Sequence, residues 1–287
     1  MIDASLYLVK VINSKKEDIE MKRILSLMLA LAIMITSAFM LVGCGEDNTL
    51  TCGVTIFANM NEKDADGNWI GFESEFAMEV GKIIGMDVEF QEIDWGQKYN
   101  ELNSGAIDCI WNGFTANSSD KINGIEKKRS DLVDFTYGYM LNQQCIVVKT
   151  SELENYSSAA DLAGKKCCVE GGSAGDSYAK TVNASSVVAT DAQINAFPEV
   201  KSGAVDFIVV DVVLAQNVCG KGNYTDLSIV TDIELESEIY AVGFKKGSDL
   251  TAKVNDAIMQ LYENGKLMEI AEKYGFENVI KITKDID

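Results

Sequence analysis

The chain has 287 residues, enough for one large domain or two smaller ones, each with its own hydrophobic core. Its 44 acidic residues outnumber the 25 basic ones and give a net charge of -19, which disfavours nucleic acids and anionic membrane faces as partners. The chain contains no histidine, which excludes histidine-based catalytic triads, imidazole general bases and ordinary histidine-ligated metal sites. We therefore expect neither a metal nor a cofactor.

The first part of the chain has the pattern of an export signal. Lys22 and Arg23 precede an almost wholly apolar run, residues 24–42. We interpret Met21 as the translation start and residues 1–20 as an over-extended gene model. Because the apolar run is long enough to span a bilayer, a retained membrane anchor is the alternative.

A lipidation motif ends this run. Leu41-Val42-Gly43-Cys44 resembles a bacterial lipobox, in which the cysteine is lipidated on sulfur and becomes the new N-terminus. The resemblance implies a signal peptide within residues 1–43, lipidation at Cys44 and a short tether over residues 44–49. We therefore expect an extracytoplasmic protein held by its lipid at the outer face of the cytoplasmic membrane.

The other cysteines show neither C-x-x-C spacing nor an identifiable disulfide pairing, so zinc and a redox dithiol are not expected. Most of them sit in apolar, strand-like runs, where a buried thiol acts as a small hydrophobic side chain. They are Cys52, Cys109, Cys145, Cys167, Cys168 and Cys219.

From residue 51 onward, short apolar segments alternate with helical patterns. The first series predicts strand 51–57, helix 72–84, strand 86–91, helix 95–103 and strand 107–111. The second series predicts strand 166–169, helix 173–182, strand 187–189, helix 191–202, strand 207–210 and helix 212–218. The end of the chain, from residue 250, is predicted to be helical.

Short buried strands alternating with helices indicate parallel sheets covered on both faces, and two such series indicate an α/β protein with two lobes. Strand-like segments 142–149 and 239–245 are expected to carry the chain from the first lobe to the second and back. This places residues 50–143 and 244–287 in lobe 1 and residues 144–243 in lobe 2. Ligands of open α/β sheets bind at the carboxyl ends of strands, so a binding cleft is expected between the lobes.

Three groups of residues lie where a predicted strand ends and a loop or helix begins. Residues 111–115 (WNGFT) offer backbone groups, the hydroxyl of Thr115 and two aromatic rings, although an ordinary turn would look the same. Residues 170–175 (EGGSAG) read either as a close backbone approach to a ligand or as a simple helix start with Ser173 as its cap. Asp211 follows a buried strand and either caps the next helix or meets a cation.

These groups suit a small zwitterion, whose carboxylate pairs with a guanidinium and whose ammonium pairs with a carboxylate. The chain has two arginines, and Arg23 lies in the signal, which leaves Arg129 to supply a guanidinium clamp. Taken alone, the run Lys127-Lys128-Arg129 would instead be a solvated basic patch.

Several segments in this order resemble the extracytoplasmic amino-acid-binding proteins of bacterial ABC importers. They are residues 67–75 (GNWIGFESE), 102–108 (LNSGAID), 134–139 (DFTYGY) and 201–206 (KSGAVD). The resemblance implies the two-lobed type II periplasmic-binding-protein fold with two hinge strands. It also implies a monomer without enzyme activity, which captures an amino acid by hinge closure and delivers it to an ABC permease.

The resemblance also implies roles for individual residues. Phe57 matches the aromatic that stacks on the ligand, Gly113 and Thr115 match positions that hold its ammonium and carboxylate, and Arg129 matches the carboxylate-binding arginine. Ser173 and Ala174 match lobe 2 donors to the carboxylate, and Asp211 matches the acid that pairs with the ammonium. Trp111 and Glu170 are further candidates to line the pocket, and together with the aromatic residues they favour a polar or cationic ligand side chain.

One departure concerns the spacing between Thr115 and Arg129, which is longer than in the family. The extra residues, 116–124, are polar and contain a glycine, so a surface loop is expected. Three other functions stay open: a ligand-binding sensory lipoprotein, an enzyme of the same fold such as a dehydratase, and a purely structural lipoprotein.

Overall fold

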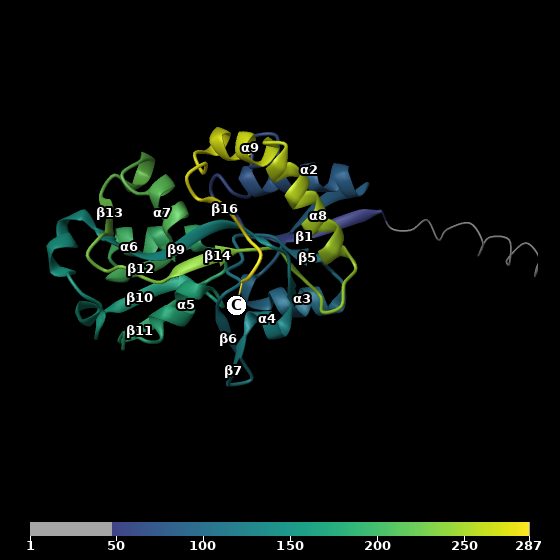
Figure 1. Cartoon of the computed structure of the whole chain (residues 1–287). Helices are drawn as coiled ribbons and strands as arrows, with labels where there is room; N and C mark the ends of the chain where they lie inside the picture. The colour runs from purple at the N-terminus through teal and green to yellow at the C-terminus, as the bar shows by residue number, and fades with distance from the viewer. Residues whose placement is uncertain (1–47, 287) are drawn as a thin grey trace, which may run out of the picture. The chain divides into compact units, whose positions relative to one another are not determined.

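The computed structural model describes residues 48–286, in which two mixed β-sheets are each flanked by helices (Figure 1). The predicted signal peptide and Cys44 lie outside the described residues. No helix within residues 48–286 has the length and apolar character needed to cross a membrane.

The first sheet has the strand order β4-β1-β5-β15-β8. Its first three strands run parallel, whereas β15 is antiparallel to both of its neighbours. The strands are β1 (Thr49–Val54), β4 (Asp87–Glu92), β5 (Cys109–Ile110), β8 (Asp134–Phe135) and β15 (Gly243–Phe244). The helical segments of this lobe are α2 (Phe72–Ile84), η1 (Trp95–Gln97), α3 (Lys98–Ser104), α4 (Arg129–Leu132), α8 (Leu250–Glu263) and α9 (Lys266–Tyr274).

The second sheet has the order β11-β10-β12-β9-β13, with β10, β11 and β12 parallel and β9 antiparallel to β12 and β13. Its strands are β9 (Gly138–Lys149), β10 (Lys166–Glu170), β11 (Ser186–Thr190), β12 (Phe207–Asp211) and β13 (Leu227–Val230). Its helical segments are η2 (Thr150–Asn155), η3 (Ala159–Leu162), α5 (Ala174–Ala179), η4 (Gln193–Asn195), α6 (Ala196–Ser202), α7 (Val212–Val218) and η5 (Gly222–Tyr224).

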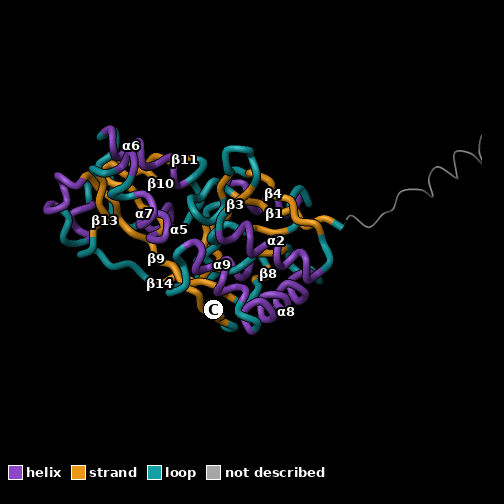
Figure 2. The backbone as a smooth tube through the Cα atoms, turned by 90° about the horizontal axis from the view of Figure 1, so that it is seen from above, coloured by secondary structure: helices purple, strands orange, loops and turns teal. Residues whose placement is uncertain are grey.

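Strand β9 belongs to both halves of the fold. Its first part, from Gly138 to Gln143, pairs with β14 (Ser237–Tyr240) and β16 (Ile280–Thr283). Its second part pairs with β12 and β13 of the second sheet. Figure 2 shows β9 and β14 running between the two groups of elements, so these strands connect the lobes.

The predicted alternation of strands and helices is confirmed, and helices 72–84 and 212–218 have the predicted bounds. Each sheet has the predicted parallel strands, and the strands that return from the crossing add antiparallel pairs, so both sheets are mixed. The segment 239–245, predicted as one strand, forms two: its first residues are the end of β14, and residues 243–244 form β15. Strand β16 was not predicted.

The segment expected as a surface loop forms part of a hairpin, β6 (Ser119–Ile122) and β7 (Ile125–Lys128). Asn123 and Gly124, the two turn residues, have φ of 52° and 80°. An Asn-Gly pair with positive φ at both residues is the preferred two-residue hairpin turn, a sequence signal that the loop prediction overlooked.

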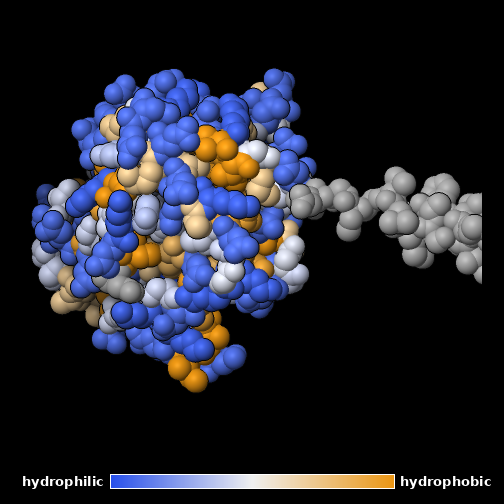
Figure 3. All heavy atoms as spheres, turned by 45° about the vertical axis from the view of Figure 1, so that its right-hand side comes forward, coloured by the Kyte–Doolittle hydropathy of each residue, from blue (hydrophilic) through white to orange (hydrophobic). Residues whose placement is uncertain are grey.

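The face drawn in Figure 3 is mostly hydrophilic, with apolar residues in small groups. One group marks the protruding hairpin, where Ile125 is 63% exposed. The six cysteines from Cys52 to Cys219 are free thiols, five of them buried as expected and Cys219 partly exposed.

A buried carboxylate ties helix α2 to the crossing strand β9. Glu73 accepts hydrogen bonds from the amide of Asn61 (2.6 Å), from the backbone of Gly113 (2.9 Å) and from the hydroxyl of Tyr139. Burial raises the pKa of Glu73 to about 7, although these hydrogen bonds oppose the shift. The folded protein therefore holds a proton on Glu73 at pH values where the unfolded chain has lost it.

This pKa shift makes part of the stability depend on pH. Between about pH 4.5 and pH 7 the folded state binds more protons than the unfolded state, so stability falls as pH rises. The stabilisation linked to Glu73 is fully present below the pKa of Glu73 in the unfolded chain and is lost as pH rises through its pKa in the folded protein. The free energy of unfolding changes by about 3 kcal/mol over this range.

Glu73→Gln mimics the protonated form. We expect it to match the wild type near pH 5 and to exceed it near pH 8.5 in urea unfolding.

Glu79→Gln, on the partly exposed face of α2 beside Lys82, is the matched control and should leave the pH dependence of unfolding unchanged. Equal stability of Glu73→Gln and wild type at both pH values would contradict the assignment.

Candidate functional site

A small cavity of about 10 Å³ lies between residues of the two lobes. It has room for about one water molecule. The first lobe contributes Trp95, Asn112, Gly113, Thr115 and Arg129, and the second lobe and β9 contribute Gln144, Glu170, Ser173, Ala174, Gln193 and Asp211. Of the nine residues predicted to bind ligand, the cavity therefore brings together Gly113, Thr115, Arg129, Glu170, Ser173, Ala174 and Asp211.

The other two predicted residues, Phe57 and Trp111, do not line this cavity and lie in the hydrophobic core. Trp111 packs edge-on against Phe76, with ring centroids 5.3 Å apart. Phe57 lies beneath Gly113, where a Cβ atom would come within 3.0 Å of the Phe57 ring. Gly113 has φ of 57°, so both its conformation and its surroundings favour glycine.

Arg129 begins helix α4, and its side chain is 1% exposed. One end of the guanidinium donates from Nη1 to the carbonyl of Thr115 and from Nη2 to Asp120, both at 3.0 Å. The guanidinium lies 5.1 Å from the centre of the Phe114 ring. Its Nε is buried and donates to no acceptor within residues 48–286, so this N–H is available to a ligand.

Asp120, from β6, is the charged partner of Arg129. It also accepts a hydrogen bond from the hydroxyl of Tyr99 at 2.7 Å and lies 3.6 Å from the ammonium of Lys98. Burial alone would raise the pKa of Asp120, but the charges of Arg129 and Lys98 outweigh burial and lower the pKa. Asp120 is therefore ionised in the folded protein at neutral pH.

Lys98 links the two lobes. Its ammonium is almost fully buried and donates to the carbonyl of Gly172 at 2.8 Å. Burial lowers the pKa of Lys98 to about 8, although Asp120 opposes the shift. A second contact between the lobes joins the hydroxyl of Thr55 to Glu170 at 3.2 Å.

Asp211 lines the cavity from the second lobe, whereas Arg129 lines it from the first. It occupies the N-cap position of α7, but its side chain makes no capping hydrogen bond. Its carboxylate instead accepts from the side-chain amides of Asn142 (2.6 Å), Gln144 and Gln193. Of the two readings of this residue, helix cap or partner of a cation, the geometry disfavours the cap.

The cavity and its surroundings concentrate carboxylates. Burial raises the pKa of Glu170 to about 8, with the charge of Asp211 adding to the shift. Burial likewise raises the pKa of Glu238 to about 7, and the pKa of Asp211 is also raised by burial. Asn142 and Gln144 both donate to Glu238, so the same two amides bridge two acids. These shifts indicate a site in which negative charge lacks a sufficient cationic partner.

Ser173 is the N-cap of α5, and its hydroxyl accepts from the backbone of Asp176 at 3.0 Å. The simple helix-start reading of residues 170–175 therefore holds. Ser173 and Ala174 nevertheless line the cavity, and the hydroxyl proton of Ser173 is left to donate to a ligand.

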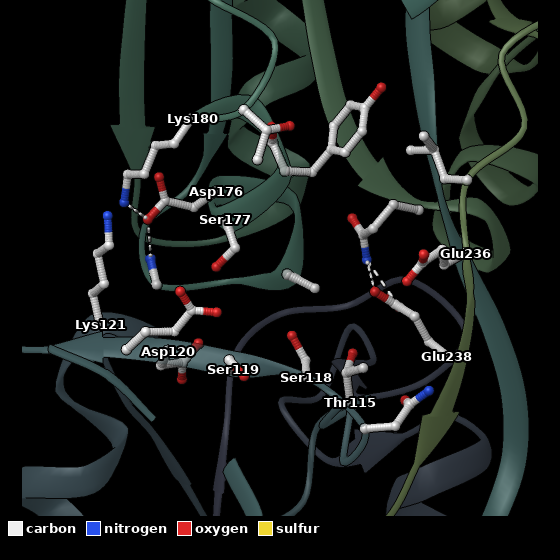
Figure 4. Close-up of a pocket in the computed structure, with 18 of the residues that line it drawn as sticks. Thr115, Ser118, Ser119, Asp120, Lys121, Asp176, Ser177, Lys180, Glu236 and Glu238 are labelled. Atoms are coloured by element: carbon white, nitrogen blue, oxygen red, sulfur yellow. Dashed lines mark hydrogen bonds and ion pairs between the residues drawn. The ribbon is translucent and has the colours of Figure 1, made fainter. Parts of the chain in front are cut away.

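A larger cleft of about 900 Å³ adjoins the cavity and shares Thr115, Gln144 and Ala174 with it (Figure 4). Its ionisable walls are mainly acidic. They include Asp120, Glu126, Asp176, Glu234, Glu236 and Glu238, against Lys98, Lys121 and Lys180. Figure 4 shows Asp120 on β6 facing Asp176 and Lys180 of the second lobe.

Sequence reasoning missed Trp95, Asn112, Gln144 and Gln193, which line the cavity. Three polar residues, Asn142, Gln143 and Gln144, interrupt the apolar run of β9. Because alternate residues of a strand face the same side, this interruption could have revealed Asn142 and Gln144 as residues facing one site. Residues 48–286 contain no cluster of cysteine and acidic side chains arranged to hold a metal ion. The arrangement is suited to binding a small dipolar molecule through opposite charges.

Comparisons with known proteins agree with this geometry. A family model described as "Bacterial extracellular solute-binding proteins, family 3" matches residues 50–278. The arginine-binding extracellular protein ArtP of Bacillus subtilis is 26% identical over 86% of this chain and 96% of its own length. An ABC uptake transporter substrate-binding protein from Streptococcus pneumoniae, solved with bound histidine, has a TM-score of 0.70 and 29% identity over 82% of this chain and 95% of that chain.

A third structure is that of the ancestral amino acid-binding protein AncCDT-1, described as a precursor of cyclohexadienyl dehydratase. It has a TM-score of 0.69 and 26% identity over 79% of this chain and 95% of that chain. The two lobes, the two crossing strands and these likenesses give the chain the type II periplasmic-binding-protein fold. The chain belongs to the bacterial extracellular solute-binding proteins, family 3.

Proposed function

We propose that the protein captures a free amino acid between its lobes and delivers it to an ABC permease. One observation carries the proposal: the guanidinium of Arg129 and the carboxylate of Asp211, both buried, meet the same cavity from different lobes. The buried Nε of Arg129 suits a ligand carboxylate, and Asp211 suits a ligand ammonium.

Capture requires the lobes to move. The cavity of about 10 Å³ is far smaller than any amino acid, so a ligand enters only when the lobes separate. Breaking the contacts of Lys98 with Gly172 and of Thr55 with Glu170 opens the site, while β9 and β14 act as hinges. A ligand that touches both lobes binds the closed form better, and this difference drives closure.

The charges favour a ligand with a cationic or polar side chain. Asp211, Glu170 and Glu238 outnumber the nearby cations, and their raised pKa values show that added positive charge would stabilise their ionised forms. Arginine and histidine, the ligands of the two relatives described above, are of this kind.

A dehydratase-like enzyme is the second candidate. It is supported by the likeness to AncCDT-1 and by Glu170, whose pKa of about 8 is suited to a general acid. The opposite charges that the two lobes present to the cavity, however, are explained by binding alone. We therefore propose a binding protein, acting as a monomer.

Arg129→Ala and Asp211→Ala test the two ends of the site. Each removes a charged hydrogen-bonding partner worth about 1.5–3 kcal/mol, so each should weaken binding at least tenfold. Thermal-shift screening of residues 45–287 against the twenty amino acids identifies the ligand, and calorimetry measures its affinity in each variant.

Asp226→Ala, which removes an exposed partner of Lys201, is the control and should bind normally. Near-normal affinity in either site variant, with the fold intact by circular dichroism, refutes that residue's role. A screen without any stabilising amino acid refutes the proposed function.

Binding should also depend on pH. Glu170 and Glu238 are partly protonated at neutral pH, and a ligand cation beside them favours their ionised forms, so binding releases protons. Affinity should therefore fall as pH falls from about 8.5 to 6, by at most about tenfold per pH unit for each proton. Calorimetry in buffers of different ionisation enthalpy measures the release, and Glu170→Gln should reduce it. Proton uptake would contradict this account.

We further propose that the mature protein is a lipoprotein anchored through Cys44, after removal of residues 1–43. Support comes from the apolar run and the lipobox in the sequence, and the extracellular family agrees with export. The full-length chain expressed in a bacterial host should partition with membranes and incorporate labelled fatty acid. Cys44→Ala should abolish the label, whereas Cys219→Ala should retain it; equal labelling of both variants counts against lipidation at Cys44.

A further inference from the structure

The hairpin β6–β7 brings a carboxylate of the protein itself to the guanidinium that a ligand carboxylate would use. We propose that Asp120 is an internal competitor for Arg129, and that it sets how much a ligand's carboxylate contributes to affinity. This inference rests on the proposed binding of amino acids.

The geometry of the guanidinium makes the competition direct. A carboxylate can be held by two parallel N–H bonds either end-on, through Nη1 and Nη2, or side-on, through Nε and Nη2. Both arrangements use Nη2, which already donates to Asp120 at 3.0 Å, and Nη1 donates to the carbonyl of Thr115. Nη2 has two N–H bonds, so a ligand carboxylate on the free Nε either takes the second one, and then lies beside Asp120 on the same guanidinium, or displaces Asp120 from it.

Burial makes sharing costly. Arg129 is 1% exposed and the Asp120 side chain 9% exposed, so little water screens the repulsion between two carboxylates on one guanidinium. Asp120 is also held by the hydroxyl of Tyr99 and lies near Lys98, and these partners stay with it after it leaves Arg129. Displacement therefore does not leave a buried carboxylate without a partner.

The position of Asp120 relative to the larger cleft and the small cavity agrees with this role. Asp120 lines the outer cleft, while its partner Arg129 lines the inner cavity, so the ion pair separates the two. β6 pairs with β7 alone and joins neither main sheet, which leaves Asp120 on an element that can shift without breaking a central ladder. A ligand that lacks a carboxylate leaves the Asp120–Arg129 pair intact.

The test compares amino acids with the amines that lack only their carboxylate: L-arginine with agmatine, L-histidine with histamine, and L-lysine with cadaverine. Calorimetry measures both members of each pair on the wild type and on Asp120→Asn. We expect the preference of the wild type for the amino acid over its amine to be at least tenfold smaller than that of Asp120→Asn. In Asp120→Asn the amino acid should bind at least tenfold tighter, and the amine should not gain.

Two variants control for structure. Asp131→Asn, an exposed acid that lines neither the cleft nor the cavity, should leave every affinity unchanged, and Asp120→Glu, which keeps the charge, should preserve the wild-type preference. Asp120→Ala replaces Asp120→Asn if the latter does not fold.

The outcomes separate the two proposals. An equal preference for the amino acid in the wild type and in Asp120→Asn overturns the competition, as does a variant in which amino acid and amine weaken equally, which would make Asp120 a structural support of Arg129. If the wild type binds none of the three amino acids but binds another, the same comparison is made with that amino acid and its amine. If no amino acid binds, the proposed function fails and the competition fails with it.

Discussion

The site depends on a guanidinium that is buried among carboxylates. Removing a charge from water costs several kcal/mol unless close partners compensate for it. For Arg129 the partners are the carbonyl of Thr115 and the carboxylate of Asp120, which lies on a hairpin outside both main sheets. The hairpin is therefore part of the site's electrostatic framework, although its sequence suggests a surface appendage.

The negative end of the cavity is built differently. Asp211 is surrounded by the amides of Asn142, Gln144 and Gln193, which donate hydrogen bonds without neutralising its charge. The positive end already has its counter-charge in the protein, whereas the negative end does not. Burial raises the pKa values of Glu170 and Asp211, and the lack of a sufficient counter-charge leaves this shift in place, which agrees with the proposed cationic ligand.

The crossing strand β9 connects this electrostatic arrangement to the motion of the lobes. Asn142 and Gln144 lie where β9 changes partners from β14 to β12, and both amides hold Asp211 and Glu238. If the proposed hinge bends at this point, the donors move relative to two carboxylates on different strands. The proposed opening of the lobes would therefore change how many hydrogen bonds Asp211 and Glu238 accept, which couples the hinge to the site.

Much of the fold was predictable because its signals are local. The apolar stripe of α2 and the run Phe207–Asp211 that forms β12 are read directly from neighbouring residues. Candidate site residues at the ends of strands were found for the same reason, since a strand's end is visible in sequence. Trp111 marks a limit of this reasoning, because sequence does not show on which side of a strand the core lies: the Trp111 ring packs on Phe76 and does not line the cavity.

Asp120 shows where such reasoning stops. Its partners Arg129 and Tyr99 are 9 and 21 residues away in the chain, and nothing in the polar run around it distinguishes an acid that points inward from one that faces water. The Asn-Gly turn favours the β6–β7 hairpin, and the position of this hairpin brings the Asp120 carboxylate to the Arg129 guanidinium. A departure in spacing between two site residues therefore indicates a change in the site itself as readily as a change in the surface.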